Sequence, residues 1–176
     1  MKIVSLLPAA TEILCDMGLV EYISAVSHEC DYPSTINNKL KITSSIIPHN
    51  INQNVIDKLV KEAVKNNIPL YEVDNEQLNK INPDLIITQG LCDVCSISED
   101  KIQATLKNNL CTLSSNTEII SLNGITFDEI CSDILTVGIA VNKEEIAQKL
   151  IKEAVGTKHK ITRERSNNSL LLLEWI

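Results

Sequence analysis

Short apolar runs alternate with amphipathic segments along most of this 176-residue chain. The runs Ile3 to Leu7 and Leu85 to Ile87 are continuously apolar, which is typical of strands buried on both faces of a parallel sheet. After the first run, Pro8 suits the first position of a helix and Gly18 suits its left-handed end. The alternation predicts an α/β fold: a Rossmann-like, mainly parallel sheet with helices on both faces.

The same patterns place the remaining elements. Strands are expected at residues 22–27, 70–73 and 110–113, and helices at 52–66, 75–81, 97–108 and 128–141. Ser96-x-x-Glu99 and Asn142-x-x-Glu145 have the spacing of capping boxes at helix N-termini. A helix from the second box to Arg165 would have about 24 residues and a length of roughly 36 Å, which is a spacer length. Gly156 is a candidate interruption of it.

The end of the sequence, Leu170-Leu171-Leu172-Leu173-Glu174-Trp175-Ile176, has the composition of a strand that no partner strand follows. An apolar strand with an uncovered edge is an aggregation hazard, so we expect the chain to stop where a second lobe begins. The expected organisation is an N-terminal α/β ligand-binding lobe over 1–125, a helical segment with an inter-lobe backbone helix over 126–166, and the first strand of a truncated second lobe over 167–176. In an alternative interpretation, residues 170–176 complete a sheet with another chain.

Charge and composition exclude some partners. The net charge is −7 and aromatic residues make up 3% of the chain, so we expect no nucleic-acid partner. No apolar run is long enough to span a membrane, and the first ten residues fit a strand better than a signal peptide. As written, the sequence predicts a cytoplasmic protein with reduced thiols, or an extracytoplasmic, membrane-associated one if a leader is missing from it.

Ligands of open α/β sheets bind at the carboxyl ends of the strands. The loops after the strands at Ile3, Tyr22 and Leu85 are therefore expected to meet at one edge of the sheet. Tyr32 is the preferred contact, because it combines a stacking face with a polar tip; alternatively it packs only its own turn. The candidate ligand-binding residues are Ser5, Pro8, Ala9, Thr11, His28, Glu29, Cys30, Asp31, Tyr32, Gln89, Leu91, Cys92, Asp93 and Cys95.

Several chemistries remain open for the polar residues of these loops. His28, Cys30, Cys92 and Cys95 form a ligand set that suits structural zinc, although a single Cys-x-x-Cys pair does not make a zinc ribbon. Cys92 and Cys95 alternatively form a redox pair, or shape the loop without chemistry, and His28 is a candidate axial ligand of a metal centre.

The acidic residues Glu29, Asp31 and Asp93 could act as general acids or bases, or cap turns and meet basic residues of a partner. No phosphate loop, nucleophile elbow or dinucleotide fingerprint occurs.

Three motifs together resemble those of a known family. They are Ile3-Val4-Ser5-Leu6-Leu7-Pro8-Ala9-Ala10-Thr11-Glu12, Val26-Ser27-His28-Glu29-Cys30-Asp31-Tyr32-Pro33 and Asn82-Pro83-Asp84-Leu85-Ile86-Ile87-Thr88-Gln89. They are similar to the vitamin B12 and ferric-siderophore substrate-binding proteins of ABC importers. The His-Glu-Cys-Asp loop and the Cys92-x-x-Cys95 loop resemble the cobalamin-binding subgroup.

The resemblance implies a two-lobed receptor that holds cobalamin or a related corrinoid in the cleft between lobes joined by one rigid helix. It implies no catalysis and no prosthetic group, the corrinoid being the transported ligand. It implies an ABC permease as partner, with Glu12 in the position of a carboxylate that docks onto permease arginines. A separate chain carrying the second lobe is a further possible partner. The alternatives are a ferric-siderophore receptor, which would favour a cleft rich in arginine or tyrosine, and a metal or redox protein that uses Cys92 and Cys95.

We predict that this chain alone binds cobalamin weakly or not at all, because the lack of the second wall of an inter-lobe cleft removes about half of the contact surface. Isothermal titration calorimetry with cyanocobalamin tests this expectation. Sub-micromolar binding by the 176-residue chain would contradict it.

Overall fold

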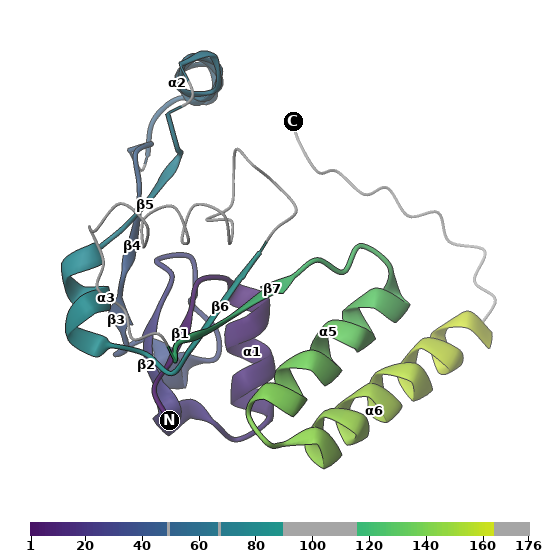
Figure 1. Cartoon of the computed structure of the whole chain (residues 1–176). Coiled ribbons are helices and arrows are strands. Elements are labelled where there is room, and N and C mark those ends of the chain that lie inside the picture. Colours follow the sequence, from purple (N-terminus) through teal and green to yellow (C-terminus); the bar gives the residue numbers. More distant parts are fainter. Residues whose placement is uncertain (49, 67, 90–115, 164–176) are drawn as a thin grey trace.

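The computed structural model describes residues 1–48, 50–66, 68–89 and 116–163, and a parallel sheet runs through them (Figure 1). The sheet has five strands in the order β3-β2-β1-β6-β7. They are β1 (Ile3–Ser5), β2 (Ile23–Val26), β3 (Leu40–Lys41), β6 (Leu85–Gln89) and β7 (Glu118–Leu122). Each neighbouring pair in this sheet is parallel. The α/β class predicted from the sequence is therefore confirmed.

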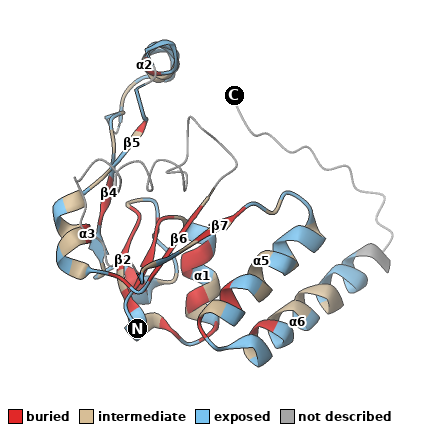
Figure 2. Cartoon of the chain, in the orientation of Figure 1, coloured by how far each residue is buried: buried red, intermediate tan, exposed pale blue. Residues whose placement is uncertain are grey.

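Helices cover both faces of the sheet. Residue Ile3 of β1 packs into a cluster that contains Leu14 and Val137, whereas its neighbour Val4 packs into a cluster that contains Leu78. Both residues of β1 are fully buried, as a strand covered on two sides requires (Figure 2). The helices are α1 (Pro8–Asp16), α2 (Gln53–Lys65), α3 (Asn75–Ile81), α5 (Phe127–Ala140) and α6 (Glu144–Arg163), with 3₁₀ turns η1 (Val20–Tyr22) and η2 (Ser34–Ile36).

None of the helices in the described ranges combines the length and the apolar composition that crossing a membrane requires.

Local sequence signals set most helix ends. Pro8 occupies the first turn of α1, and Gly18 follows that helix with a φ of 75°. A capping box that the sequence analysis overlooked begins α5: the Thr126 hydroxyl accepts a hydrogen bond from the Glu129 N–H, and the Glu129 carboxylate accepts one from the Thr126 N–H. Hydrogen bonds from the backbone N–H groups of Thr126 and Ile125 lower the pKa of the Glu129 carboxyl.

The capping box expected at Asn142 is replaced by a different junction. Asn142 has a φ of 55°, the left-handed conformation of a residue that ends a helix, here α5. The carbonyl of Lys143 accepts the first helical hydrogen bonds of α6, from the N–H groups of Ile146 and Ala147. Lys143 is therefore the N-cap, one residue later than the sequence pattern indicated.

Helix α6 has 20 residues and continues through Gly156, the candidate interruption. Its length is about 30 Å at 1.5 Å per residue. The expected helix at 97–108, the strands at 110–113 and 170–176, and the capping box at Ser96 lie outside the described residues.

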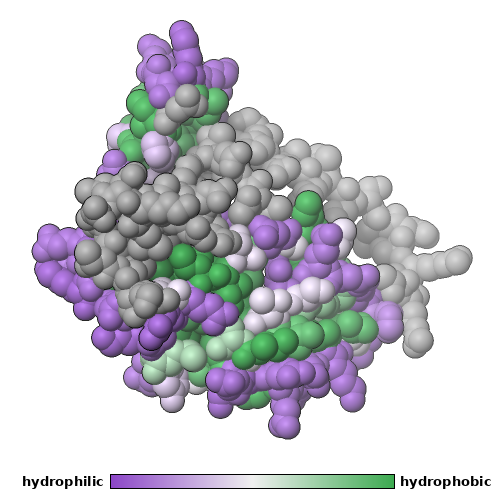
Figure 3. Space-filling view, in the orientation of Figure 1, coloured by the Kyte–Doolittle hydropathy of each residue, from purple (hydrophilic) through white to green (hydrophobic). Residues whose placement is uncertain are grey.

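A second, antiparallel sheet was not anticipated. The strand at residues 70–73 was expected to continue the parallel series, but β5 (Tyr71–Val73) pairs antiparallel with β4 (Thr43–Ser45) in a two-stranded ribbon. The polar sequence Thr43-Ser44-Ser45 carries no apolar strand pattern, so only pairing between distant segments forms it. This ribbon leads to α2, which lies apart from the five-stranded sheet (Figure 1) and shows both hydrophilic and hydrophobic residues on its surface (Figure 3).

We expect Gly138→Ala to destabilise the packing of α5 on α6. A Cβ at this position would lie 2.4 Å from the Cβ of Ala147 and 3.3 Å from the carbonyl oxygen of Lys143. Overpacking of this kind costs about 1–3 kcal/mol of the free energy of unfolding, which chemical denaturation measures.

The matched control is Gly156→Ala in α6, where an added Cβ meets nothing within 4 Å. It should stabilise the protein by about 0.4–1 kcal/mol, because alanine restricts the unfolded chain and favours the helix. Equal stability changes in the two variants would contradict the close approach at Gly138.

Candidate functional site

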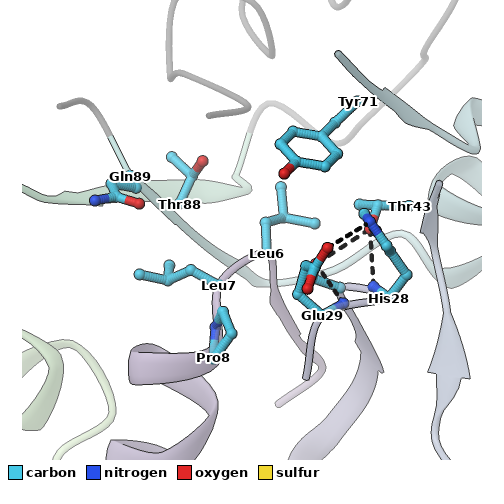
Figure 4. Close-up of a pocket in the computed structure, with 10 residues that line it drawn as sticks. Leu6, Leu7, Pro8, His28, Glu29, Thr43, Tyr71, Thr88 and Gln89 are labelled. Atoms are coloured by element: carbon cyan, nitrogen blue, oxygen red, sulfur yellow. Dashed lines mark hydrogen bonds and ion pairs between the residues drawn. The ribbon is translucent and has the colours of Figure 1, made fainter. Parts of the chain in front are cut away.

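A pocket of about 300 Å³ opens at the carboxyl ends of β1, β2 and β6, where ligands of open α/β sheets bind (Figure 4). The adjacency of these strands explains its position, since their parallel pairing brings the three ends to one edge. The pocket is lined by Leu6, Leu7, Pro8, Ser27, His28, Glu29, Thr43, Tyr71, Thr88 and Gln89.

The apolar part of the lining comes from the chain that leaves β1. The apolar sequence continues past the last paired residue of the strand into Leu6 and Leu7, and Pro8 then starts α1. Leu6 is 8% exposed and packs on the α3 side of the sheet. This segment supplies a rigid, apolar surface that a flat hydrophobic ligand could contact.

Hydrogen bonds and one ion-pair contact form the polar wall. The Thr43 hydroxyl accepts a hydrogen bond from the backbone N–H of His28 at 2.9 Å and lies 2.6 Å from Nδ1 of the same residue. It also donates to the Ser27 hydroxyl at 3.2 Å. Nε2 of His28 lies 3.1 Å from Oε1 of Glu29. The carboxylate of Glu29 is therefore linked through His28 to buried residues of the framework.

An aromatic ring closes this wall from the antiparallel ribbon. The ring of Tyr71 lies 5.3 Å from that of His28, centroid to centroid, at an interplanar angle of 49°. The His28 ring is thus held by a hydroxyl on one nitrogen, a carboxylate at the other and an aromatic neighbour (Figure 4). A ring with so many contacts is fixed in orientation, which a preorganised binding site requires.

Beneath the pocket lies a buried polar cluster. The Thr11 hydroxyl donates to the Ser5 hydroxyl at 2.8 Å and lies 3.1 Å from Sγ of Cys30. All three side chains are buried, and the Lys41 ammonium donates a hydrogen bond to the Cys30 carbonyl. Burial raises the pKa of the Cys30 thiol. This cluster ties the loop after β2 to α1 and is not part of the pocket lining.

The candidate residues from the sequence therefore divide into groups. Those that line the pocket are Pro8, His28, Glu29 and Gln89. Those in the buried cluster are Ser5, Thr11 and Cys30. Ala9, Asp31 and Tyr32 are exposed and do not line this pocket, while Leu91, Cys92, Asp93 and Cys95 lie outside the described residues.

Three of these placements bear on particular hypotheses. Tyr32, the preferred contact, is 65% exposed, and Tyr71 is the tyrosine that lines the pocket. Among the described residues no group of three or more His, Cys, Asp or Glu side chains could hold a metal ion. The zinc and redox hypotheses for Cys92 and Cys95 stay predictions, because that loop is outside the described ranges.

Six residues that line the pocket were not among the candidates: Leu6, Leu7, Ser27, Thr43, Tyr71 and Thr88. Four of them lie within the three motifs of the sequence, and the two that lie outside every motif are Thr43 and Tyr71. Both belong to the antiparallel ribbon, which places them beside the loop after β2. The available signal was weak: a threonine and a tyrosine at the starts of two short strands. Recognising their role requires knowing that the two strands pair with each other and lie at the edge of the sheet.

Comparison with known proteins finds similar solved structures only. No protein-family model and no curated protein matches the chain. Solved structures do match. A possible iron-binding periplasmic solute-binding protein from Staphylococcus epidermidis is 22% identical, with a TM-score of 0.66 over 96% of this chain and 52% of its own. The periplasmic heme-binding protein HutB of Vibrio cholerae is 18% identical, with a TM-score of 0.62 over 96% of this chain and 51% of its own.

The periplasmic vitamin B12-binding protein BtuF of Vibrio cholerae is 22% identical, with a TM-score of 0.56 over 86% of this chain and 46% of its own. The chain therefore has the periplasmic-binding-protein fold. It spans about half the length of each of these structures. The three neighbours bind solutes according to their names, and identities this low establish the fold alone.

We expect Cys30 to resist alkylation in the native protein. Its raised pKa leaves little thiolate at pH 8, and its side chain is 1% exposed. Cys131, which is partly exposed, should react with iodoacetamide before Cys30 does, as peptide mass spectrometry can show.

In denaturant, where burial no longer raises the thiol pKa, the two cysteines should react at similar rates. Equal rates in the native protein would show that the Ser5–Thr11–Cys30 cluster is not closed as described.

Proposed function

We propose that this chain is the ligand-binding part of a substrate-binding component of an ABC-type importer, and that its ligand is cobalamin or a related corrinoid. The observation that carries the proposal is the pocket at the carboxyl ends of β1, β2 and β6. Its lining combines apolar surface with hydroxyl, amide, imidazole and carboxylate groups. The likeness to periplasmic binding proteins supports a role in solute binding without catalysis.

The charge of the lining favours a corrinoid over the other ligands named for the structural neighbours. A heme carries two propionates, and many ferric siderophores are anionic, so both call for arginine or lysine in the site. None of the described residues that line the pocket is arginine or lysine. A corrinoid is fringed with amides, which pair with groups such as the Glu29 carboxylate, the Gln89 amide and the Thr88 hydroxyl.

The size of the pocket also bears on affinity. Its volume of about 300 Å³ is at the lower end of ordinary ligand sites. A corrin ring is broader than this, so an edge of the ring with its amide side chains would enter while the rest lies across the opening. A second surface is needed to cover that remainder, which we assign to a second lobe, in the same protein or in a separate chain.

The proposed partners and place of action follow from this assignment. A binding component delivers its metal complex to an ABC permease, and Glu12 is exposed on α1, where a partner could reach it. The periplasmic neighbours support action outside the cytoplasm. The corrinoid is cargo in this proposal, and no resident cofactor is required.

The proposal predicts where a corrinoid binds. In a titration of ¹⁵N-labelled protein with cyanocobalamin, the largest amide shifts should fall on His28, Glu29 and Tyr71. Hemin and ferric citrate should give weaker binding. Tighter binding of either anionic complex, or shifts confined to residues far from the pocket, would contradict the proposal.

A matched pair of variants sharpens this test. Tyr71→Ala should weaken cyanocobalamin binding by about threefold to tenfold, the loss expected for one aromatic contact. Tyr22→Ala removes an exposed ring from η1, before β2, and should leave binding unchanged.

A further inference from the structure

We propose that Glu29 determines the ligand specificity of the pocket, with His28 as its positioning residue: the carboxylate selects neutral or cationic ligands that present hydrogen-bond donors, and rejects anionic metal complexes. This inference rests on the proposed function, because it assigns a charge preference to the same pocket. It goes further by attributing that preference to one side chain.

The first step is that Glu29 is held in place. An exposed carboxylate ordinarily samples many positions, and that of Glu29 is 56% exposed. Oε1, however, lies 3.1 Å from Nε2 of His28, and the backbone N–H of Glu29 donates to the Ser27 hydroxyl at 3.2 Å. Both the backbone and the side chain of Glu29 are thus anchored to the carboxyl end of β2.

The second step is that His28 is anchored in turn. Its Nδ1 lies 2.6 Å from the hydroxyl of Thr43, which is 7% exposed and also bonds to Ser27. Its Nε2 is shielded from solvent and faces Glu29. The single hydroxyl proton of Thr43 goes to Ser27, so Nδ1 of His28 is the donor to Thr43; a proton on Nε2 then makes the ring cationic and pairs it with the Glu29 carboxylate. His28 therefore acts on a ligand through Glu29.

The third step concerns charge. Glu29 is the only Asp, Glu, Lys or Arg among the described residues that line the pocket. The nearby ammonium of Lys41 is bound to the carbonyl of Cys30, in the cluster beneath the pocket. An ionised carboxylate only accepts hydrogen bonds, so ligand amides and ammonium groups pair with Oε2 and ligand carboxylates are repelled. The net charge of −7 adds to that repulsion.

The experiment compares ligands that differ in one group. Cyanocobalamin carries uncharged amides, and each of its isomeric monocarboxylic acids replaces one amide with a carboxylate. Dissociation constants are measured by ¹⁵N NMR titration at low salt, where a surface charge acts most strongly. For wild-type protein, at least one acid should bind about fivefold to tenfold more weakly than cyanocobalamin, as expected for two partly solvated like charges.

Two variants, each of which replaces one glutamate with glutamine, identify the side chain that causes this preference. Glu29→Gln keeps the shape of the side chain and removes its charge, and should bring the ratio of dissociation constants close to one. Glu21→Gln removes the same charge from η1, which precedes β2 at the opposite end from the pocket, and should keep the wild-type ratio.

His28→Phe tests the positioning role. It keeps a ring beside Tyr71 and removes the nitrogen that faces Glu29. If the ratio of dissociation constants for His28→Phe lies between the wild-type ratio and the Glu29→Gln ratio, His28 positions Glu29. If His28 has a purely structural role, the variant changes the stability of the protein and leaves that ratio unaltered.

The outcomes separate this inference from the proposed function. If cyanocobalamin binds at the pocket and Glu29→Gln keeps the wild-type ratio, Glu29 is not the determinant, although the corrinoid proposal stands. If hemin or ferric citrate binds at the pocket more tightly than cyanocobalamin, the corrinoid proposal fails, and this inference fails with it.

Discussion

The structure depends on the burial of β1 on both faces. Ile3 and Val4 point to opposite sides of the sheet and are each fully buried, so a slip of one residue would exchange two packed environments. With its register fixed, β1 pairs in parallel with β2 on one side and with β6 on the other. The carboxyl ends of the three strands must then share one edge. The pocket is a direct consequence of this packing.

A second constraint joins the antiparallel ribbon to that edge. Thr43 lies on β4, yet its hydroxyl bonds to Ser27 and to both the backbone and the ring of His28, which follow β2. The buried hydroxyl of Thr43 thus pairs with polar groups that follow a strand of the other sheet. Without this hydroxyl those groups would lose a hydrogen-bond partner, which would lower the free energy of unfolding. The ribbon also carries Tyr71 to the face of His28. The polar wall of the pocket therefore needs both sheets.

The chemical character of the pocket follows from these two constraints. The chain that leaves β1 supplies apolar surface, and the chain that leaves β2 supplies an imidazole and a carboxylate. This combination is unusual for a site that binds an anionic metal complex, and it suits a ligand rich in amides. A likeness of fold to proteins that bind iron, heme and vitamin B12 does not distinguish among these ligands, so the corrinoid proposal rests on the charge of the described lining.

The sequence by itself determined the α/β class, the strand at Ile3, the helix that Pro8 begins and the edge of the sheet at which the loops after β1, β2 and β6 meet. Apolar runs and helix-end residues are local signals, so they can be read without coordinates. Only the tertiary structure decided that Cys30 turns into a buried cluster while Glu29 lines the pocket, and that Tyr71, not Tyr32, is the aromatic residue there. The orientation of loop side chains and the pairing of β4 with β5 depend on contacts between distant segments, which no local pattern encodes.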